Sequence, residues 1–539
     1  MSMSDTSPST RPLARCVMVL GTTSGAGKSW LATALCRWYA DQGYKVAPFK
    51  AQNMSNNARV VPTPEGRMGE IGSAQYFQAL AARAEPDVRM NPLLLKPEAD
   101  THSQVVLMGA VNHELTQAPW RGRSERVWPV ITAALDSLRA ENDVVVIEGA
   151  GSPAEINLYD SDIVNMRVAR HAQAACVLVT DIDRGGAFAH LYGTWALLPE
   201  GDRQLFKGFV LNKFRGDASL LAPAPQMLQE LTGIPTVATI PMQWHHGLPE
   251  EDGVFDDRPS LGPVRSSGCG HVKGLRVAVV AYPRISNLDE FQPLKNVPGL
   301  RLVWARTPSD LVGADWVILP GSKSTVADLA WMRQQGLDAA VCAHAAQGGA
   351  VLGICGGLQM LGEAIVDPEG VEHRPVLAGG PGVSCLGQAP VDGQRAASLH
   401  DVLAGNAPGL GLLPLVTSFG VDKALARTCA RFGEVTGPWQ ALTGVEVSGY
   451  EIHHGQTALH PAMAAAGQQA ESVLPGGLAW QGGSGHVLGL YLHGLFEDAA
   501  VCAALFGAGT PTVENALQGL GRTVETCFER EMLLEWVKP

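Results

Sequence analysis

The sequence lacks the features that define several classes of protein. No apolar run is long enough to cross a bilayer, and residues 1–14 have no apolar core of the kind found in a signal peptide. The ten cysteines show neither a paired framework nor a C-x-x-C spacing, so neither a disulfide scaffold nor a zinc site is predicted. The net charge of −12 is spread along the chain without a run of Lys or Arg that would follow a nucleic acid. We therefore expect a cytoplasmic protein with small-molecule partners.

The composition is that of an ordinary globular enzyme: of the 539 residues, 46% are hydrophobic and 17% are charged. A chain of this length is too long to fold around one hydrophobic core, so two or three domains are expected. Residues 258–272 are rich in Gly, Ser and Pro and predict a linker between domains of residues 15–257 and 273–500. Residues 1–14 are expected to be disordered, and residues 501–539 to form a helical C-terminal tail.

Short β-rich apolar runs alternate with Ala- and Leu-rich helical stretches in both halves. This alternation predicts an α/β fold with two doubly wound parallel sheets, one in each half. Residues 366–440 are rich in Gly and Pro, and no element is assigned there. The predicted strands are Cys16–Leu20, Val144–Ile147, Ala175–Thr180, Gly208–Leu211, Thr236–Ile240, Leu275–Val280, Trp316–Leu319, Ala350–Ile354 and Val487–Tyr491.

A cysteine between glycines is the clearest catalytic candidate. The run AVLGICGG places Cys355 at the end of an apolar strand and before a helical pattern, which is the cysteine form of a nucleophile elbow. The N-terminus of a helix favours a thiolate at such a position. His493, in GLYLHGLF at the end of another strand, is the expected proton-transfer partner. The backbone N–H groups of Gly321 and Gly356 are expected to hold the oxyanion.

This order of oxyanion turn, elbow and strand-end histidine resembles the class I glutamine amidotransferases over residues 274–500. Most of that class carry a Glu two residues after the His, which orients the ring, whereas this chain has Leu495 there. The site is then either a Cys–His dyad or a triad whose carboxylate comes from elsewhere, with Glu451 and Glu497 as candidates. Loss of that Glu is typical of the branch that amidates cobyrinic acid.

The run GTTSGAGKS lies between a predicted strand and a helical run, which is the context of a phosphate-binding loop. Lys28 is expected to reach the terminal phosphates of ATP, and the Ser29 hydroxyl to hold Mg²⁺. The loop is one residue longer than G-x4-G-K-[ST] and resembles the dethiobiotin synthetase branch of P-loop enzymes. The ATP-binding positions in it are Thr22, Gly25, Ala26, Gly27, Lys28 and Ser29.

Polar residues also follow three other predicted strands of the first half. Glu148 and Asp181 are the carboxylates expected to bind Mg²⁺ together with Ser29. Asn212, in NKFRGD, lies where an amide can read the edge of adenine. Because the carboxyl ends of parallel strands meet at one edge of a sheet, these residues are expected to converge.

The run PFKAQNMSNNA is unusually polar for a segment that follows a presumed strand. Lys50 is expected to stabilise negative charge as a phosphoryl group moves. The residues alone leave a plain polar loop open as the alternative. The candidates for binding amide-rich edges of a substrate are Gln52, Asn53, Asn56 and Asn57.

Taken together, the motifs resemble the cobyric acid synthase family over residues 15–500, and PFKAQNMSNNA separates the chain from the sister a,c-diamide synthases. The resemblance implies stepwise amidation of peripheral carboxylates of a corrinoid, adenosylcobyrinic acid a,c-diamide, with one ATP and one glutamine per amide. Phosphoryl transfer would convert a poorly electrophilic carboxylate into an acyl phosphate. Ammonia released inside the protein would then attack it before becoming ammonium.

Three alternatives remain at this stage. One is an a,c-diamide synthase-like amidoligase. The second is a P-loop switch ATPase of the partition or septum-site type, which would not carry an elbow cysteine and a strand-end histidine. The third is an inactive amidotransferase module that only binds glutamine or a partner, and the presence of both Cys355 and His493 argues against it.

Overall fold

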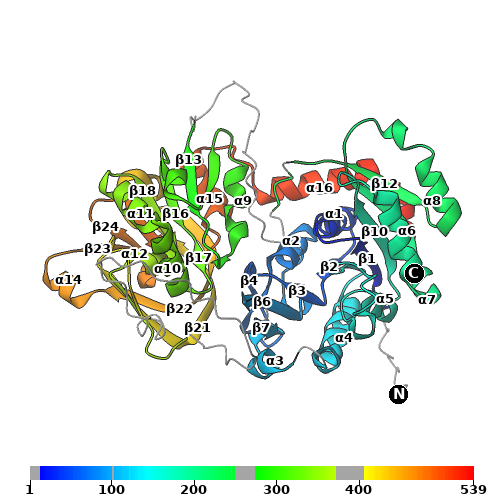
Figure 1. Ribbon diagram of the computed structural model, residues 1–539, viewed down its shortest axis with the longest axis horizontal. Coiled ribbons are helices and arrows are strands. Elements are labelled where there is room, and N and C mark those ends of the chain that lie inside the picture. Colours follow the sequence, from blue (N-terminus) through cyan, green and yellow to red (C-terminus); the bar gives the residue numbers. More distant parts are fainter. Residues whose placement is uncertain are drawn as a thin grey trace, which may run out of the picture. The chain divides into compact units, whose positions relative to one another are not determined.

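The computed structural model describes residues 12–99, 102–119, 122–244, 246–248, 274–371 and 406–538. The chain divides into two compact units, which we call unit 1 (Met1–Val254 and Pro511–Pro539) and unit 2 (Phe255–Thr510) (Figure 1). The predicted linker lies outside the described residues, as do the first eleven residues of the predicted disordered N-terminus. None of the described helices is long and apolar enough to span a membrane.

The main sheet of unit 1 has the strand order β12-β11-β10-β1-β9-β2, with every neighbouring pair parallel. All five strands predicted for the first half are present in it. Side chains alternate along β1, so Val17 and Val19 face α1 while Met18 and Leu20 join the cluster of α4, α5 and α6. Helices thus cover both faces, as the predicted doubly wound fold requires.

The strands of this sheet are β1 (Arg15–Gly21), β2 (Val46–Phe49), β9 (Val144–Glu148), β10 (Ala175–Asp181), β11 (Phe206–Phe214) and β12 (Thr236–Pro241). A smaller sheet holds β3 (Gln52–Met54), β6 (Leu93–Ala99), β7 (His102–Leu107) and β8 (Ala110–Val111), and β4 (Ala58–Pro62) pairs with β5 (Met68–Gly72). The helices of the first stretch are α1 (Lys28–Asp41), α2 (Ser73–Ala81), α3 (His113–Gln117), α4 (Arg123–Glu141), α5 (Met166–Ala172), α6 (Ala187–Leu197), α7 (Glu200–Arg203) and α8 (Ala224–Thr232).

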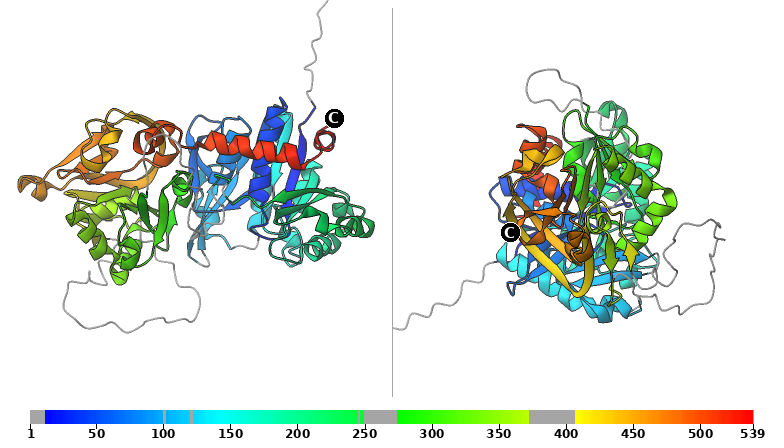
Figure 2. Two further views of the ribbon diagram at one scale, coloured as in Figure 1. Left: turned by 90° about the horizontal axis from the view of Figure 1, so that it is seen from above. Right: turned by 90° about the vertical axis from the view of Figure 1, so that its left-hand side faces the viewer.

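The C-terminal helices α16 (Val513–Cys527) and α17 (Arg530–Glu535) belong to unit 1, where α16 lies beside α1 (Figures 1 and 2). Leu517, Leu520 and Val524 of α16 are buried in the same apolar cluster as the core face of α1. The Arg37 guanidinium of α1, 1% exposed, donates to the Glu514 carboxylate at 2.5 Å. The predicted C-terminal tail is therefore divided, because its first helix, α15 (Ala499–Phe506), packs within unit 2.

Truncating one of these buried side chains is expected to destabilise unit 1. Leu520→Ala removes a side chain that is 1% exposed, and we expect it to lower the free energy of unfolding by about 2–5 kcal/mol. Urea denaturation followed by circular dichroism measures the change. Glu525→Ala, at an exposed position of the same helix, is the control and is expected to stay within about 0.5 kcal/mol of the unchanged protein. Equal effects of the two changes would show that α16 contributes no core.

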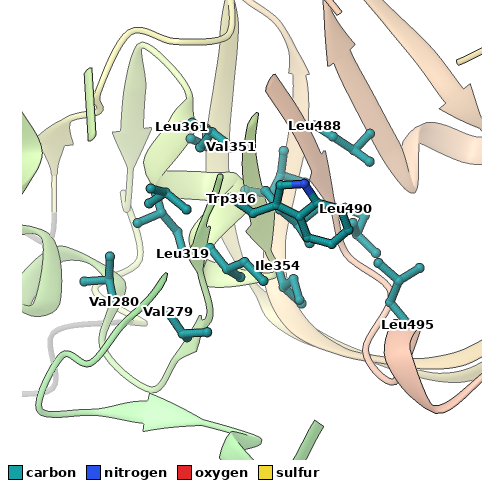
Figure 3. Close-up of a cluster of buried hydrophobic side chains, with 14 of the residues drawn as sticks. Val279, Val280, Trp316, Leu319, Val351, Ile354, Leu361, Leu488, Leu490 and Leu495 are labelled. Atoms are coloured by element: carbon teal, nitrogen blue, oxygen red, sulfur yellow. The ribbon is translucent and has the colours of Figure 1, made fainter. Parts of the chain in front are cut away.

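Unit 2 is built on a seven-stranded sheet of order β15-β13-β16-β18-β25-β24-β23, in which the first five strands are parallel. All four strands predicted for the second half are present. Apolar side chains from its central strands, among them Val279, Leu319, Val351 and Leu490, fill the core shown in Figure 3. The predicted second parallel α/β unit is thus confirmed, with an antiparallel edge added.

The strands of this sheet are β13 (Arg276–Val280), β15 (Arg301–Ala305), β16 (Trp316–Leu319), β18 (Ala350–Ile354), β23 (Ala470–Leu474), β24 (Ala479–Gly482) and β25 (Val487–Leu490). Smaller sheets hold β14 (Ile285–Ser286) with β17 (Gly321–Ser322), and β19 (Ala364–Val366) and β20 (Ala407–Pro408) with a long pair, β21 (Leu415–Arg431) and β22 (Glu446–Leu459). The other helices in the described part of this unit are α9 (Gln292–Lys295), α10 (Thr325–Gln335), α11 (Leu337–Ala346), α12 (Gly356–Leu361) and α14 (Pro461–Ala465).

Candidate active sites

Cys355 occupies the sharp turn between β18 and α12 that the sequence predicts. Its φ of 51° is uncommon for a residue with a side chain and is typical of strained functional positions. The neighbouring Gly357 permits the turn, because a Cβ there would lie 1.9 Å from the Leu319 carbonyl oxygen. The Cys355 thiol donates to the carbonyl oxygen of Ile452, 3.6 Å away on β22.

His493 follows β25, and its side chain is 1% exposed. Its Nδ1 lies 3.2 and 3.3 Å from the two carboxylate oxygens of Glu290, and the same carboxylate accepts from the Gly494 N–H at 3.2 Å. A carboxylate only accepts, so the proton sits on Nδ1 and leaves Nε2 for Cys355. Burial lowers the pKa of His493, but the charges of Glu290 and Cys355 outweigh it and raise that pKa to about 10.

Glu290 therefore takes the place beside His493 that the sequence suggested for Glu451 or Glu497. The Glu451 carboxylate contacts Thr428 and His453 instead, and Glu497 closes the short turn through a bond from its N–H to the Gly494 carbonyl. No motif marked Glu290, because it lies in a 3-10 turn (Leu288–Phe291) far from His493 in the chain.

The two glycines predicted to hold an oxyanion lie next to this pair. A Cβ at Gly321 would come within 3.0 Å of the His493 ring, and one at Gly356 within 2.8 Å of the Ser322 nitrogen. Buried Asp328 supports the turn, accepting from the Ser322 hydroxyl at 2.6 Å and from the Arg284 N–H at 3.2 Å. Burial raises the pKa of Asp328 to about 6.

In unit 1, the predicted phosphate-binding loop lies between β1 and α1. Lys28 Nζ donates to the carbonyl oxygens of Thr23 and Gly151, each at 3.1 Å. The Thr22 hydroxyl donates to the Thr180 hydroxyl at 3.0 Å. Asn212 Nδ2 donates to the Ala26 carbonyl at 3.0 Å, and its Oδ1 accepts from the N–H of the next residue at 2.9 Å. Asn212 thus fastens the loop, and the adenine contact expected for it stays a prediction.

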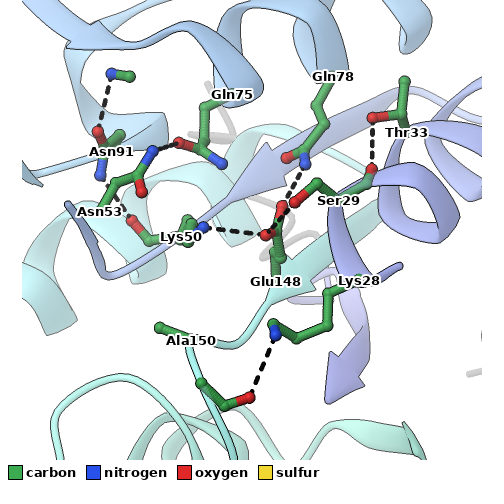
Figure 4. Close-up of polar contacts among 12 residues, drawn as sticks. Lys28, Ser29, Thr33, Lys50, Asn53, Gln75, Gln78, Asn91, Glu148 and Ala150 are labelled. Carbon is green, nitrogen blue, oxygen red and sulfur yellow. Dashed lines mark hydrogen bonds and ion pairs between the residues drawn. The ribbon is translucent and has the colours of Figure 1, made fainter. Parts of the chain in front are cut away.

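Glu148 stands at the centre of a buried polar cluster beside the loop (Figure 4). Its carboxylate, 0% exposed, accepts from the Ser29 hydroxyl at 2.8 Å, from Lys50 Nζ at 2.9 Å and from Gln78 Nε2 at 2.5 Å. Three residues of the predicted ATP site are therefore together, and Gln78 is a member that the sequence did not reveal.

Asp181, the other carboxylate expected at a metal, has cations for neighbours. Its Oδ2 lies 3.1 Å from Lys213 Nζ and 3.4 Å from Arg184 Nε. Within the described residues, no group of three or more His, Cys, Asp and Glu side chains is placed to hold a metal ion. Ser29 and Glu148 are brought together as expected, whereas Asp181 pairs with Lys213 and Arg184.

The candidate substrate residues divide by burial. Asn53 and Asn57 are 3% and 4% exposed, and the Asn53 amide donates to Gln75 Oε1 at 3.0 Å, so the two hold the loop's own fold. Gln52 and Asn56 are only half-buried, and the Asn56 amide donates to the Pro97 carbonyl at 3.2 Å. Of these four candidates, Gln52 and Asn56 are therefore the two that a substrate could reach.

Comparison with known proteins shows which family carries these two sites. Residues 17–250 match the model of the CobQ/CobB/MinD/ParA nucleotide binding domain, and residues 276–501 match that of the CobB/CobQ-like glutamine amidotransferase domain. A cobyric acid synthase of Acidovorax sp. (strain JS42) is 69% identical over 525 residues, covering 97% of this chain and 98% of its own. That of Leptothrix cholodnii is 60% identical over 535 residues, covering 98% of both chains.

The chain belongs to the cobyric acid synthase family. It is a glutamine-dependent amidoligase with a nucleotide-binding domain and a glutamine amidotransferase domain. The family predicted from the motifs is thereby confirmed. The amidotransferase domain model includes Glu290, Cys355 and His493, and the nucleotide-binding model includes the loop and Glu148.

Proposed function

We propose that the chain amidates several peripheral carboxylates of adenosylcobyrinic acid a,c-diamide in turn, using ATP, Mg²⁺ and ammonia taken from glutamine. The observation that carries this proposal is the presence in one chain of two complete sets of groups. One set is a strained cysteine with a buried His–Glu pair. The other is a phosphate-binding loop that carries Lys28 and whose Ser29 contacts a buried carboxylate, which also pairs with a second lysine.

In unit 2, the Cys355 thiol gives its proton to His493 Nε2, and the resulting thiolate attacks the γ-carboxamide carbon of glutamine, while the backbone N–H groups at Gly321 and Gly356 receive the oxyanion. The protonated His493 gives its Nε2 proton to the departing nitrogen, and ammonia leaves as the Cys355 thioester forms. Glu290 keeps the other proton on Nδ1 throughout, and so fixes the ring with Nε2 toward the sulfur. Water then hydrolyses the thioester to glutamate.

In unit 1, the Ser29 hydroxyl and the Glu148 carboxylate are oxygen donors 2.8 Å apart, the kind of pair to which Mg²⁺ adds phosphate oxygens. Bound Mg²⁺ would neutralise charge on the ATP phosphates. Lys28 would contact the terminal phosphates, and Lys50 would face the γ-phosphoryl group as it moves to the substrate carboxylate. Asp181 is left out of this set because its partners are cations.

For the corrinoid, we propose contacts with Gln52 and Asn56, because among the polar residues of the PFKAQNMSNNA segment theirs are the partly exposed side chains. The carboxamide side chains can form hydrogen bonds with the amides already present on the substrate and with those that each amidation adds. Asn53 and Asn57 are buried and stabilise this segment, through the contact of the Asn53 amide with Gln75 and that of the Asn57 carbonyl with the Ser73 N–H.

The proposal is tested with Cys355→Ala. Glutamine-driven amidation of the corrinoid is expected to be abolished, while amidation with added ammonium salt persists, because unit 1 retains its own site. Mass spectrometry of the corrinoid products measures both rates. Cys342→Ala, a half-buried cysteine of the same unit, is the control and is expected to keep both activities.

Survival of glutamine use in Cys355→Ala would refute the role of Cys355. If a corrinoid with free carboxylates failed to stimulate ATP hydrolysis by the unchanged protein, the assignment of substrate would fail while the amidoligase class would stand.

A further inference from the structure

Strand β22 lies beside the catalytic cysteine and histidine, because Tyr450 forms a β-bridge with His493 and the Ile452 carbonyl accepts from Cys355. A Cβ added at Gly449 would lie 2.4 Å from the His493 carbonyl oxygen, and one at Gly455 would lie 2.5 Å from Gln359 Nε2, one helical turn after Cys355. Because alternate residues of a strand share a face, Glu451 and His453 lie on that same face between the two glycines. The Ile452 carbonyl between them accepts from the Cys355 thiol at 3.6 Å.

The His453 ring is held in one orientation and one tautomer. It stacks on the buried Tyr491 ring, with centroids 3.9 Å apart and planes 22° apart. Its Nδ1 lies 2.8 Å from the Gly455 carbonyl oxygen, which only accepts, so Nδ1 carries the proton. In the neutral ring, Nε2 then directs a lone pair toward Glu451.

Glu451 presents a second acceptor at the same point. Its Oε2 lies 3.3 Å from His453 Nε2, and its Oε1 accepts from the Thr428 hydroxyl at 2.5 Å. A carboxylate oxygen and an imidazole lone pair that face one another suit a group carrying several N–H donors and a positive charge.

Glu290, Asp328 and Glu451 are acidic side chains of the segments that contact His493, the oxyanion turn and Cys355. Glu290 and Asp328 are each 0% exposed, and they serve His493 and the oxyanion turn. The side chain of Glu451, at 14% exposed, is the one a substrate can reach. Glutamine carries a single positive group, its α-ammonium, which needs an anionic partner when it leaves water.

We propose that Glu451 and His453 bind the α-ammonium group of the glutamine substrate. This inference rests on the proposed glutaminase role of Cys355. Two ammonium protons point to Glu451 Oε2 and His453 Nε2, and the side chain of glutamine runs from there toward the sulfur. Because this contact is formed in the ground state and kept in the transition state, its loss raises KM more than it lowers kcat.

The test compares L-glutamine with glutaramate, the same molecule without the α-amino group. Glu451→Gln keeps the shape of the side chain and removes its charge, and Glu446→Gln is the control, since Glu446 lies on the same strand and pairs with Arg431 at the surface. We expect Glu451→Gln to raise KM for glutamine about 100-fold, with kcat/KM for glutaramate nearly unchanged. Ammonium-driven amidation should keep its rate in both variants.

A second variant, His453→Asn, is expected to raise KM for glutamine by about 10-fold, because it removes an uncharged acceptor only. The inference is overturned if Glu451→Gln weakens glutamine and glutaramate by the same factor, or leaves KM for glutamine as in the control. The proposed function fails separately, and visibly, if the unchanged protein makes no amide from glutamine at all.

Discussion

Replacing Glu290 with Gln is expected to lower kcat for glutamine-driven amidation by about 10³–10⁴-fold, the size of effect seen when the orienting acid of a catalytic triad becomes an amide. A glutamine amide can donate to Nδ1 of His493, which favours the tautomer with its proton on the wrong nitrogen. Ammonium-driven amidation should be unaffected, because the cluster around Glu148 is untouched. Rates with the two nitrogen sources measure the difference.

The pH dependence of the same variant gives a second readout. The pKa of His493 is about 10, and Glu290 is the larger of the two charges that raise it against the effect of burial. Losing that charge lowers the pKa, so the alkaline loss of glutamine-driven kcat should move to lower pH in Glu290→Gln. Glu497→Gln is the matched control and should behave as the unchanged protein does. An unmoved alkaline limb in Glu290→Gln would contradict the role of Glu290.

Replacing Lys28 with Ala is expected to lower amidation about 10²–10³-fold with glutamine and with ammonium salt alike, since a charge aimed at the phosphates is lost from a largely buried site. Hydrolysis of glutamine to glutamate depends only on unit 2 and should continue. Both products are measured in one reaction, by mass spectrometry of the corrinoid and by assay of glutamate.

Lys207→Ala serves as the control for Lys28→Ala, because Lys207 is an exposed lysine of the same unit. A Lys28 variant that lost activity with glutamine but kept it with ammonium would place Lys28 outside the ATP chemistry.

Local patterns predicted the elements that carry motifs. Cys355 and the phosphate-binding loop follow apolar runs and precede helical ones, so both could be placed on turns from the sequence alone. Glu290 and Gln78 could not, because their roles depend on partners that the fold brings to them from 203 and 70 residues away. Asn212 lies where expected, but tertiary contacts determine that its amide faces the loop.

The long strands β21 and β22 show another limit of sequence patterns. Many of their side chains are half-buried or exposed, so the apolar alternation that marks a strand is weak along Leu415–Arg431. Their pairing over most of their length, more than any local preference, sets their conformation. This is why Glu451 could be suspected as a functional residue while its neighbours His453 and Thr428 could not be placed around it.

Unit 1 is built from two segments that are far apart in the chain, and this affects when it can fold during synthesis. The ribosome completes all of Phe255–Thr510 before it reaches α16, which at about 5–20 residues per second delays that helix by roughly 10–50 s. During that interval the surface of α1 that α16 covers, with Leu31 and Leu35 in the shared cluster, has no partner from the C-terminus. A nascent chain therefore holds a finished glutaminase unit while its nucleotide unit is still incomplete. Messages that end before the codon for Val513 would yield chains that lack both C-terminal helices of unit 1.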